Sequence, residues 1–227
     1  MGCDIHLYVE KIVNGEWVTA DKWTENKWYE EEKKYGATKM TIDWEDQLYT
    51  GRNYQLFSFL ADVRNGTGFA GVDTGNHITP IAPPRGLPED VSPELWALST
   101  SPDWHSHSWF TVKKLNEANW LQIITLRGVV GPENFRRWDY FGKPEGWSGS
   151  VSGGLVKNIS NEAMKELFPD WPSVRDYKGN ISYVTQVEWK TLLSNMVEPF
   201  LVDTLPKLNA INPEHPEDVR IVFWFDN

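Results

Sequence analysis

Apolar and polar residues alternate at the start of the chain, and an apolar run closes it. The apolar residues of the first segment occupy every second position, at Cys3, Ile5, Leu7 and Val9. This period is typical of a half-buried β-strand, and Asn14-Gly15 then predicts a hairpin turn into a second short strand. Residues 219–225 are apolar on both faces except at Arg220, which predicts a central strand. We therefore expect strands at both ends of the chain.

Apolar residues with helical spacing follow Asn53, a residue type that often caps helices. The pattern predicts a helix from Asn53 to about Arg64, and Asn65-Gly66 would end this helix in the left-handed conformation. Arg52 would then lie at the helix N-terminus.

Capping residues and short apolar runs predict the remaining elements. Short helices are expected after Ser92, Thr111 and Ser160. The helix after Thr111 would extend to about Asn119, and residues 121–126 are predicted to form a buried strand. Thr185 and Glu188 have the spacing of a capping box. They predict a longer helix, which Pro199 would kink or end.

Two irregular segments lie between these elements. Residues 65–75 form a glycine-rich loop, and Gly142 to Gly154 is a Gly/Ser-rich stretch that we interpret as a mobile loop and a candidate lid. Strands at both ends, with helices and long loops between them, predict a single α+β domain over residues 1–227 with a mixed or antiparallel sheet.

Composition narrows the class of partner. The net charge of -10 argues against a nucleic-acid polymer as partner, because no long basic face can form. A small anionic ligand needs only a few arginines, and four lie in the first 130 residues, at Arg52, Arg64, Arg85 and Arg127. The 13 Trp residues offer rings that pack or that stack on a flat ligand.

The single cysteine and the absence of a long apolar run bear on location. Cys3 alone cannot form an intramolecular disulfide, and it fits a reducing compartment. No apolar run approaches the length of about 20 residues that a membrane span needs. We therefore expect a cytoplasmic protein that does not bind membranes, and the sequence leaves its oligomeric state open.

Three of the five histidines fall into two short clusters. Asp4 and His6 share one face of the first predicted strand, and His105 and His107 precede a predicted helix start. Histidine can serve as acid or base near neutral pH, so these four residues are the candidate catalytic set. The candidate ligand-binding residues are Arg52, Arg64, Arg85, Asn53, Tyr54 and Trp109.

Several segments resemble a family of uncharacterised proteins seen in phage and bacterial genomes. They are Gly2-Cys3-Asp4-Ile5-His6, Gly51-Arg52-Asn53-Tyr54, Leu60-Ala61-Asp62-Val63-Arg64, Pro84-Arg85-Gly86-Leu87-Pro88 and His105-Ser106-His107-Ser108-Trp109. The resemblance covers residues 1–120 and the final strand, and it implies a viral context, with the host cytosol as location.

A second, looser resemblance is to calcineurin-like metallophosphoesterases. Asp4-Ile5-His6, Gly75-Asn76-His77 and His105-Ser106-His107 are similar to three metal-site motifs of that family and follow in the same order. The Gly-Asp-x-x-Asp element of the family is missing between the first and second motifs.

These observations lead to two hypotheses of different classes. In the first, the protein is a phosphodiesterase-type hydrolase that cleaves a small nucleotide, such as a cyclic nucleotide immune signal of bacterial antiviral defence. The reaction would use the histidines either without a cofactor or with a divalent transition metal held by Asp4, His6, His105 and His107. In the second, the protein binds and sequesters such a signal without cleaving it.

Overall fold

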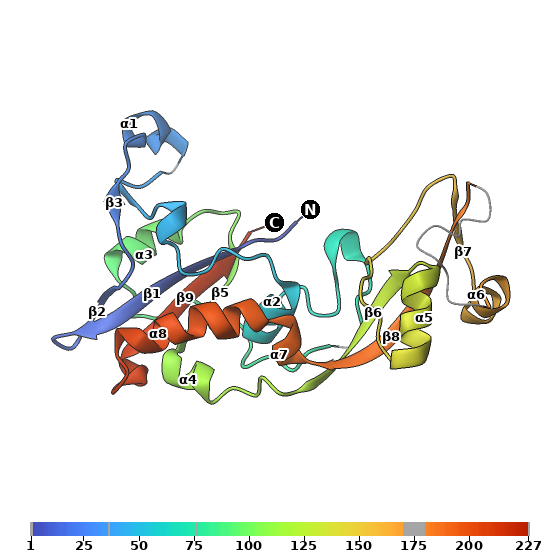
Figure 1. The fold of residues 1–227 in the computed structure, drawn as a ribbon. Helices are drawn as coiled ribbons and strands as arrows, with labels where there is room; N and C mark the ends of the chain where they lie inside the picture. The colour runs from blue at the N-terminus through green and yellow to red at the C-terminus, as the bar shows by residue number, and fades with distance from the viewer. Residues whose placement is uncertain (1, 36, 76, 170–179, 227) are drawn as a thin grey trace. The chain divides into compact units, whose positions relative to one another are not determined.

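The computed structural model describes residues 2–35, 37–75, 77–169 and 180–226. The chain divides into two compact units. Unit 1 consists of residues 1–63, 79–120 and 196–227, and unit 2 consists of residues 64–78 and 121–195. The fold is α+β, as predicted (Figure 1). The sequence predicts one domain over residues 1–227, and this stays a prediction.

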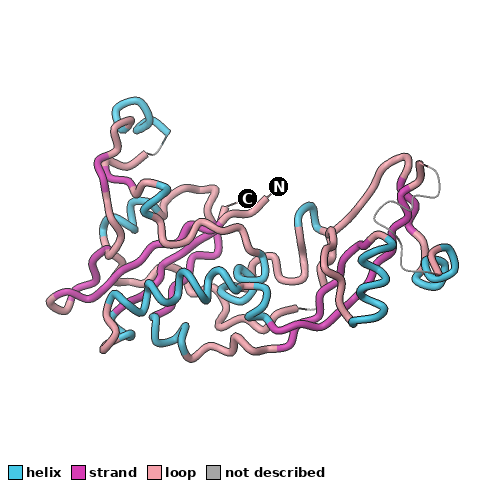
Figure 2. The backbone as a smooth tube through the Cα atoms, in the orientation of Figure 1, coloured by secondary structure: helices cyan, strands magenta, loops and turns pink. Residues whose placement is uncertain are grey.

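Unit 1 is built on a four-stranded antiparallel sheet in the order β2-β1-β9-β5. Its strands are β1 (Ile5–Val13), β2 (Glu16–Thr19), β5 (His105–Thr111) and β9 (Val219–Phe225). The first and last strands of the chain are therefore neighbours, and Figure 2 shows the two termini side by side. This confirms the predicted sheet. Strand β9 is central because it pairs with β1 on one side and β5 on the other, and every one of its residues is buried.

Both faces of this sheet are covered. On one face Phe225 packs against Phe57, with ring centroids 5.1 Å apart. On the other face Val222 and Trp224 pack with Leu95. Side chains of antiparallel neighbours that lie directly opposite point to the same face, so the register assigns each residue of β1 and β5 to one face or the other.

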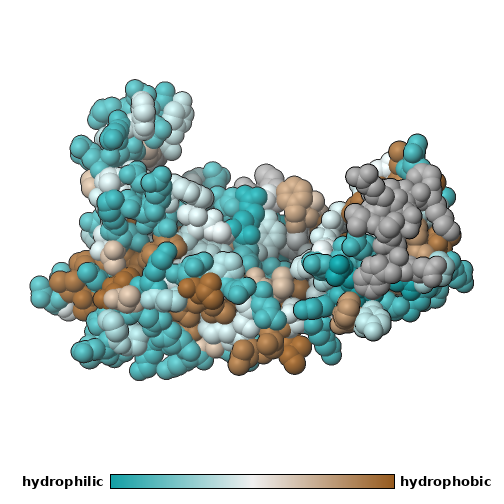
Figure 3. Space-filling view, in the orientation of Figure 1, coloured by the Kyte–Doolittle hydropathy of each residue, from teal (hydrophilic) through white to brown (hydrophobic). Residues whose placement is uncertain are grey.

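Helices and short strands complete unit 1. Its helices are α1 (Tyr29–Glu32), α2 (Tyr54–Ala61), α3 (Pro93–Leu98), α4 (Val112–Asn116), the π-helical turn Phe200–Thr204 and α8 (Leu205–Ile211). A two-stranded sheet pairs β3 (Thr24–Glu25) with β4 (Met40–Thr41). The segment around α1 is largely hydrophilic at its surface (Figure 3), as its charged sequence predicts.

The predicted caps at Asn53 and Thr111 form, and both helices that they begin are shorter than predicted, whereas the Ser92 side chain makes no capping hydrogen bond to α3. The Asn53 side chain accepts a hydrogen bond from the backbone N–H of Leu56 and caps α2. This helix ends at Asp62, which adopts the left-handed conformation, and not at Asn65-Gly66 as predicted. Thr111 caps α4, which stops at Asn116 because its C-terminal carbonyls are already bonded by a tighter turn there.

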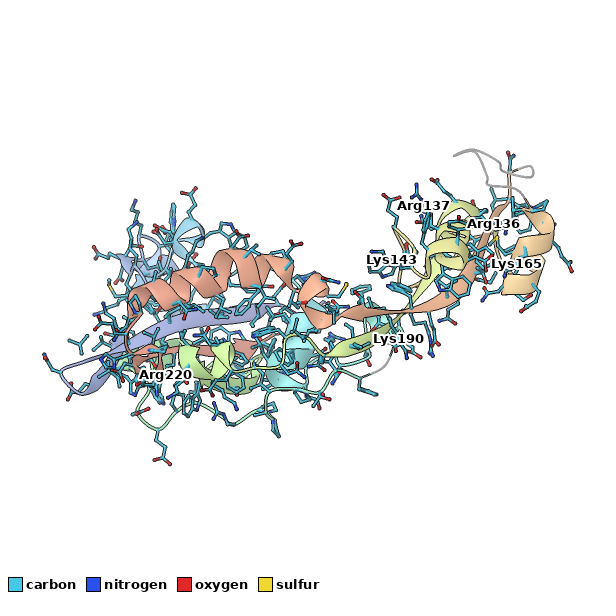
Figure 4. The ribbon with its side chains drawn as sticks, turned by 60° about the horizontal axis from the view of Figure 1, so that its bottom comes forward. Arg136, Arg137, Lys143, Lys165, Lys190 and Arg220 are labelled. Atoms are coloured by element: carbon cyan, nitrogen blue, oxygen red, sulfur yellow. The ribbon has the colours of Figure 1, made fainter. Side chains whose placement is uncertain are left out.

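Two charged side chains, those of Arg220 and Glu10, are buried in the sheet of unit 1. Arg220 donates to Glu10 at 2.7 Å and to Asp90 at 2.7 Å, and its guanidinium lies 3.9 Å from the ring centroid of Trp17. Figure 4 labels Arg220. A buried charge is tolerated only when it is paired in this way, which explains how an arginine fits within a central strand.

Unit 2 contains a three-stranded sheet in the order β6-β8-β7. Its elements are β6 (Ile123–Val130), α5 (Pro132–Phe141), β7 (Val156–Asn158), α6 (Asn161–Leu167), β8 (Ser182–Leu192) and α7 (Leu193–Met196). The last residue of α7, Met196, already belongs to unit 1. Asp139 of α5 binds Lys165 of α6 at 2.7 Å, and Figure 4 labels Lys165 beside α5. Ser160 caps α6, as predicted.

One sequence prediction in unit 2 is wrong, and a second, the strand at 121–126, is right only in part. Residues 185–192 belong to β8 and not to a helix, and Thr185 donates to Asn161 instead of capping. The reason is an alternation from Thr185 to Lys190, buried and exposed in turn, which the capping-box spacing obscured. The predicted buried strand at 121–126 begins at Ile123 and is exposed on one face, since Ile123 itself is 71% exposed.

Candidate active site

The first predicted cluster forms at the end of the sheet where β1 and β9 meet. His6 lies opposite Trp224 in the register, and its Nε2 lies 3.1 Å from Oδ2 of Asp226. Both side chains are about one-third exposed, at 30% and 34%. The imidazole therefore has a carboxylate partner that fixes its orientation while it stays open to solvent.

Asp4 does not take the role predicted for it. The sequence made Asp4 a candidate catalytic residue beside the histidines, but its carboxylate binds the guanidinium of Arg52, with Nε at 2.6 Å from Oδ1. The hydrogen bond from Arg52 lowers the pKa of Asp4. Asp226 holds the ring instead, and its backbone N–H donates to the carbonyl of Asp4.

Arg52 lies beside this pair of carboxylates. Its pKa is raised first by the hydrogen bond to Asp4 and, to a smaller extent, by the charge of Asp226. The side chain is 53% exposed, so its guanidinium keeps donors for a solvent-borne anion while it binds Asp4.

A β-bulge separates the two histidines of the second cluster. His105 lies opposite Phe225 and Ser108 lies opposite Phe223, so one extra residue is inserted between them. Ser106 accommodates the insertion with a positive φ of 54°. As a result His105 and His107 do not share a face. The predicted catalytic set is thus only partly brought together.

His107 joins His6 on one face of the sheet. Its ring lies 5.5 Å from the ring of Trp224, and the ring of His6 lies 6.3 Å from the same indole. Nε2 of His107 bonds to the carbonyl of Ser99 at 3.1 Å, so this nitrogen carries the proton and Nδ1 keeps a lone pair. Burial lowers the pKa of His107, which makes the ring neutral at pH 7.

His105 lies on the opposite face. Its ring stacks on Phe225 with centroids 6.1 Å apart, and Nδ1 bonds to the hydroxyl of Ser106 at 2.9 Å. Its Nε2 is buried without a hydrogen-bond partner. Because Phe225 and Trp224 point to opposite faces of β9, His105 does not face His6.

Aromatic rings surround the two histidines that share a face. The ring of Trp104 lies 5.2 Å from His6 and 5.3 Å from Trp224, and the ring of Tyr8 lies 5.0 Å from Trp224. The site thus combines two imidazoles with flat apolar surfaces, which suits a ligand with both a reactive polar group and a ring.

The other ligand-binding candidates of unit 1 have structural contacts. Arg85 stacks on Trp109 at 4.1 Å and donates to its carbonyl, and burial lowers the pKa of Arg85. The Asn53 amide donates to the carbonyl of Met196 at 2.7 Å while it caps α2. The Tyr54 hydroxyl accepts the backbone N–H of Cys3. Asn53 and Tyr54 therefore position β1 and α2.

Arg64 and the glycine-rich loop belong to unit 2. Amides of the loop donate within the loop itself, from Gly68 to Val72, from Thr74 to Gly66 and from Gly75 to the Asp73 side chain. These bonds leave those amides without capacity for a phosphate. Arg127 binds Asp73 and Glu188, so it too has carboxylate partners.

The metal version of the hypothesis has no matching donor cluster. Among the described residues, no group of three or more His, Cys, Asp or Glu side chains is arranged to hold a metal ion. Asp4 is bound to Arg52, and His105 is on the other face from His6. The four residues proposed as a ligand set therefore do not form one.

Comparison of the chain with protein-family models, with curated proteins and with solved structures finds no match. No helix within the described ranges has both the length and the apolar character that crossing a membrane requires.

Asp226 is the site residue that the sequence prediction missed. It directly follows the last strand, and Asp4 directly precedes the first. If the two terminal strands had been paired in antiparallel register from the sequence, Asp226 would have fallen beside Asp4 and His6.

Proposed function

We propose that the protein is a hydrolase that cleaves a phosphodiester bond in a small nucleotide, using His107 as base and His6 as acid. The observation that carries this proposal is the placement of both imidazoles on one face of the sheet, around one indole, with Asp226 bound to one of them. The reaction needs proton transfer at two oxygens, and two histidines can supply it near neutral pH.

The two rings have different hydrogen-bond partners, a carboxylate for His6 and a backbone carbonyl for His107. His107 is neutral, and Nδ1 holds the lone pair that takes a proton from a ribose hydroxyl. The hydroxyl oxygen then bonds to phosphorus. As that bond forms, the bond from phosphorus to the leaving oxygen breaks, and the His6 imidazolium donates its Nδ1 proton to that oxygen, which leaves a cyclic phosphate. Water then completes the hydrolysis: neutral His6 takes a proton from the water, the water oxygen bonds to phosphorus, and the ribose oxygen leaves with the proton that His107 carries. Asp226 stabilises the imidazolium through Nε2.

Cations near the site support a phosphorylated substrate. The exposed Arg52 guanidinium lies close enough to Asp4 and Asp226 to be affected by both charges. Arg85 stacks on Trp109, which lies on the same face of the sheet as Trp224 because it pairs with Val222. Arginine suits phosphate because its planar fork donates two parallel hydrogen bonds.

The biological setting is part of the proposal. Motifs such as Gly2-Cys3-Asp4-Ile5-His6 resemble phage proteins, so we propose a cyclic nucleotide signal of bacterial antiviral defence as substrate and the host cytoplasm as location. The second candidate, sequestration without cleavage, is favoured by the aromatic rings around Trp224, because stacking alone can hold a base.

The test is incubation of the purified protein with a panel of cyclic mono-, di- and oligonucleotides, with and without divalent metal, followed by chromatography. Cleavage is expected, and it should fall at least a hundredfold in His6→Ala and His107→Ala. His105→Ala is the matched control, since it removes a histidine from the opposite face, and it should retain most activity.

Two outcomes separate cleavage from sequestration. After heat denaturation of the protein, an enzyme leaves altered nucleotide, and a sequestering protein returns the nucleotide intact. If the whole panel is recovered unchanged under all conditions, the hydrolase proposal is refuted. If His105→Ala loses as much activity as His107→Ala, the assignment of the base is wrong.

A further inference from the structure

Trp224 carries a polar group that the fold leaves unsatisfied. The side chain is fully buried, and its Nε1 has no hydrogen-bond partner. The indole is bordered by the rings of His6, Tyr8, Trp104 and His107. The unpaired N–H therefore lies within the same group of rings that forms the candidate active site.

An unpaired buried donor is costly and uncommon. Most buried polar groups are hydrogen-bonded, and loss of one partner costs the desolvation of the group that remains. A second buried indole of unit 1 follows the rule, because Nε1 of Trp120 donates to the carbonyl of Leu115 at 2.7 Å. Trp224 is thus distinguished from Trp120 by its missing acceptor and by its two histidine neighbours.

We infer that Trp224 and Trp104 form a subsite for a nucleobase, in which Nε1 of Trp224 donates to a carbonyl oxygen or ring nitrogen of the base. The inference rests on the proposed function and deepens it, since it assigns the part of the substrate that does not react. The base stacks on the ring of Trp104, which is half-buried. Stacking supplies binding energy with any base, and the N–H adds a hydrogen bond to an acceptor of the base.

Access to the subsite requires a local movement. Nε1 of Trp224 is covered, and Trp104 lies on the segment between α3 and β5. The start of this segment is held by the bond between His107 and the carbonyl of Ser99. Binding of the base therefore shifts Trp104 and brings the base next to His107.

The experiment measures binding and not turnover. Equilibrium dialysis compares cyclic AMP and cyclic GMP with ribose cyclic phosphate, which lacks a base. Replacing Trp224 by benzothienylalanine keeps the ring shape and removes only the N–H. We expect about tenfold weaker binding of the cyclic nucleotides, which corresponds to one hydrogen bond, and no change for ribose cyclic phosphate. Trp104→Ala should weaken binding of the cyclic nucleotides as well.

The same replacement at Trp120 is the matched control. It breaks a satisfied hydrogen bond, so it should lower the melting temperature and leave nucleotide affinity unchanged. At Trp224 the melting temperature should not fall. Equal affinity for cyclic nucleotides before and after the replacement at Trp224 overturns the subsite, and so does an absence of binding by both cyclic nucleotides.

Failure of the subsite and failure of the proposed function give different results. Nucleotides that bind through Trp224 but are never cleaved leave the subsite standing and remove the hydrolase. Cleavage with unchanged affinity after the replacement at Trp224 removes the subsite alone.

Discussion

The ionisation of Asp21 is expected to make the stability of the protein depend on pH. Strand β2 ends at Thr19, and beyond it the Asp21 carboxylate accepts the backbone N–H of Val9 at 2.6 Å. Burial raises the pKa of Asp21 to about 7, with a contribution from Glu10, and the bond from Val9 offsets part of the effect. The folded protein therefore favours the neutral carboxyl group.

The size and direction of the effect follow from this pKa. The rise from 3.8 to about 7 corresponds to about 4 kcal/mol, at about 1.4 kcal/mol per unit. In the unfolded chain Asp21 ionises near its ordinary value, so the full stability is present below that pH. Stability is then lost as the pH rises towards 7, and the loss levels off above it.

Asp21→Asn tests this reasoning. The amide oxygen can still accept from Val9, and the side chain cannot ionise. The free energy of unfolding is measured with urea and circular dichroism. Between pH 5 and pH 8 the free energy of unfolding of the variant, relative to that of the wild type, should rise by about 2.5 kcal/mol. Asp203→Asn, at an exposed position, is the control for loss of an acidic group and should show no such trend. If the free energies of unfolding of Asp21→Asn and the wild type differ by the same amount at pH 5 and pH 8, to within about 0.5 kcal/mol, the argument is refuted.

Three other changes probe packing and pairing. Glu10→Gln should cost about 3 kcal/mol in urea unfolding, because it leaves the buried Arg220 without one of its charge partners; a cost below about 1 kcal/mol would contradict this. Gly128→Ala places a methyl group 2.6 Å from Cδ1 of Trp147. We therefore expect the free energy of unfolding to fall by about 1–3 kcal/mol and the near-UV circular dichroism spectrum to change. An unchanged spectrum would show that the indole is not packed there. Asn53→Ala removes the α2 cap and should lower the free energy of unfolding by about 1 kcal/mol or more, and an unchanged melting temperature would show that the cap is dispensable.

Local signals predicted much of the fold where each depended on adjacent residues. The hairpin at Asn14-Gly15 forms with both residues at positive φ, and Asn53, Thr111 and Ser160 cap helices as expected. These features depend on hydrogen bonds within a few residues, so the sequence nearby is sufficient to indicate them.

The errors arose where distant partners decide the structure. Thr185 has the spacing of a capping residue, but its segment pairs along its length with β6, and tertiary pairing overrides a local signal. The single inserted residue at Ser106 separates His105 from His107, although a regular strand would have placed them on one face. Neither the bulge nor the partnership of Asp226 with His6 can be identified without the register of the neighbouring strands.

The pairing of β1 with β9 has a consequence for synthesis of the protein. Asp226 lies 220 positions after His6 in the chain, so it leaves the ribosome later than His6 does. The pair of His6 and Asp226 cannot form, and Trp224 cannot be buried, until β9 has emerged and inserted between β1 and β5. A nascent chain therefore exposes both edges of the gap that β9 will fill, and chaperones that bind exposed β-edges would have their longest opportunity to act there.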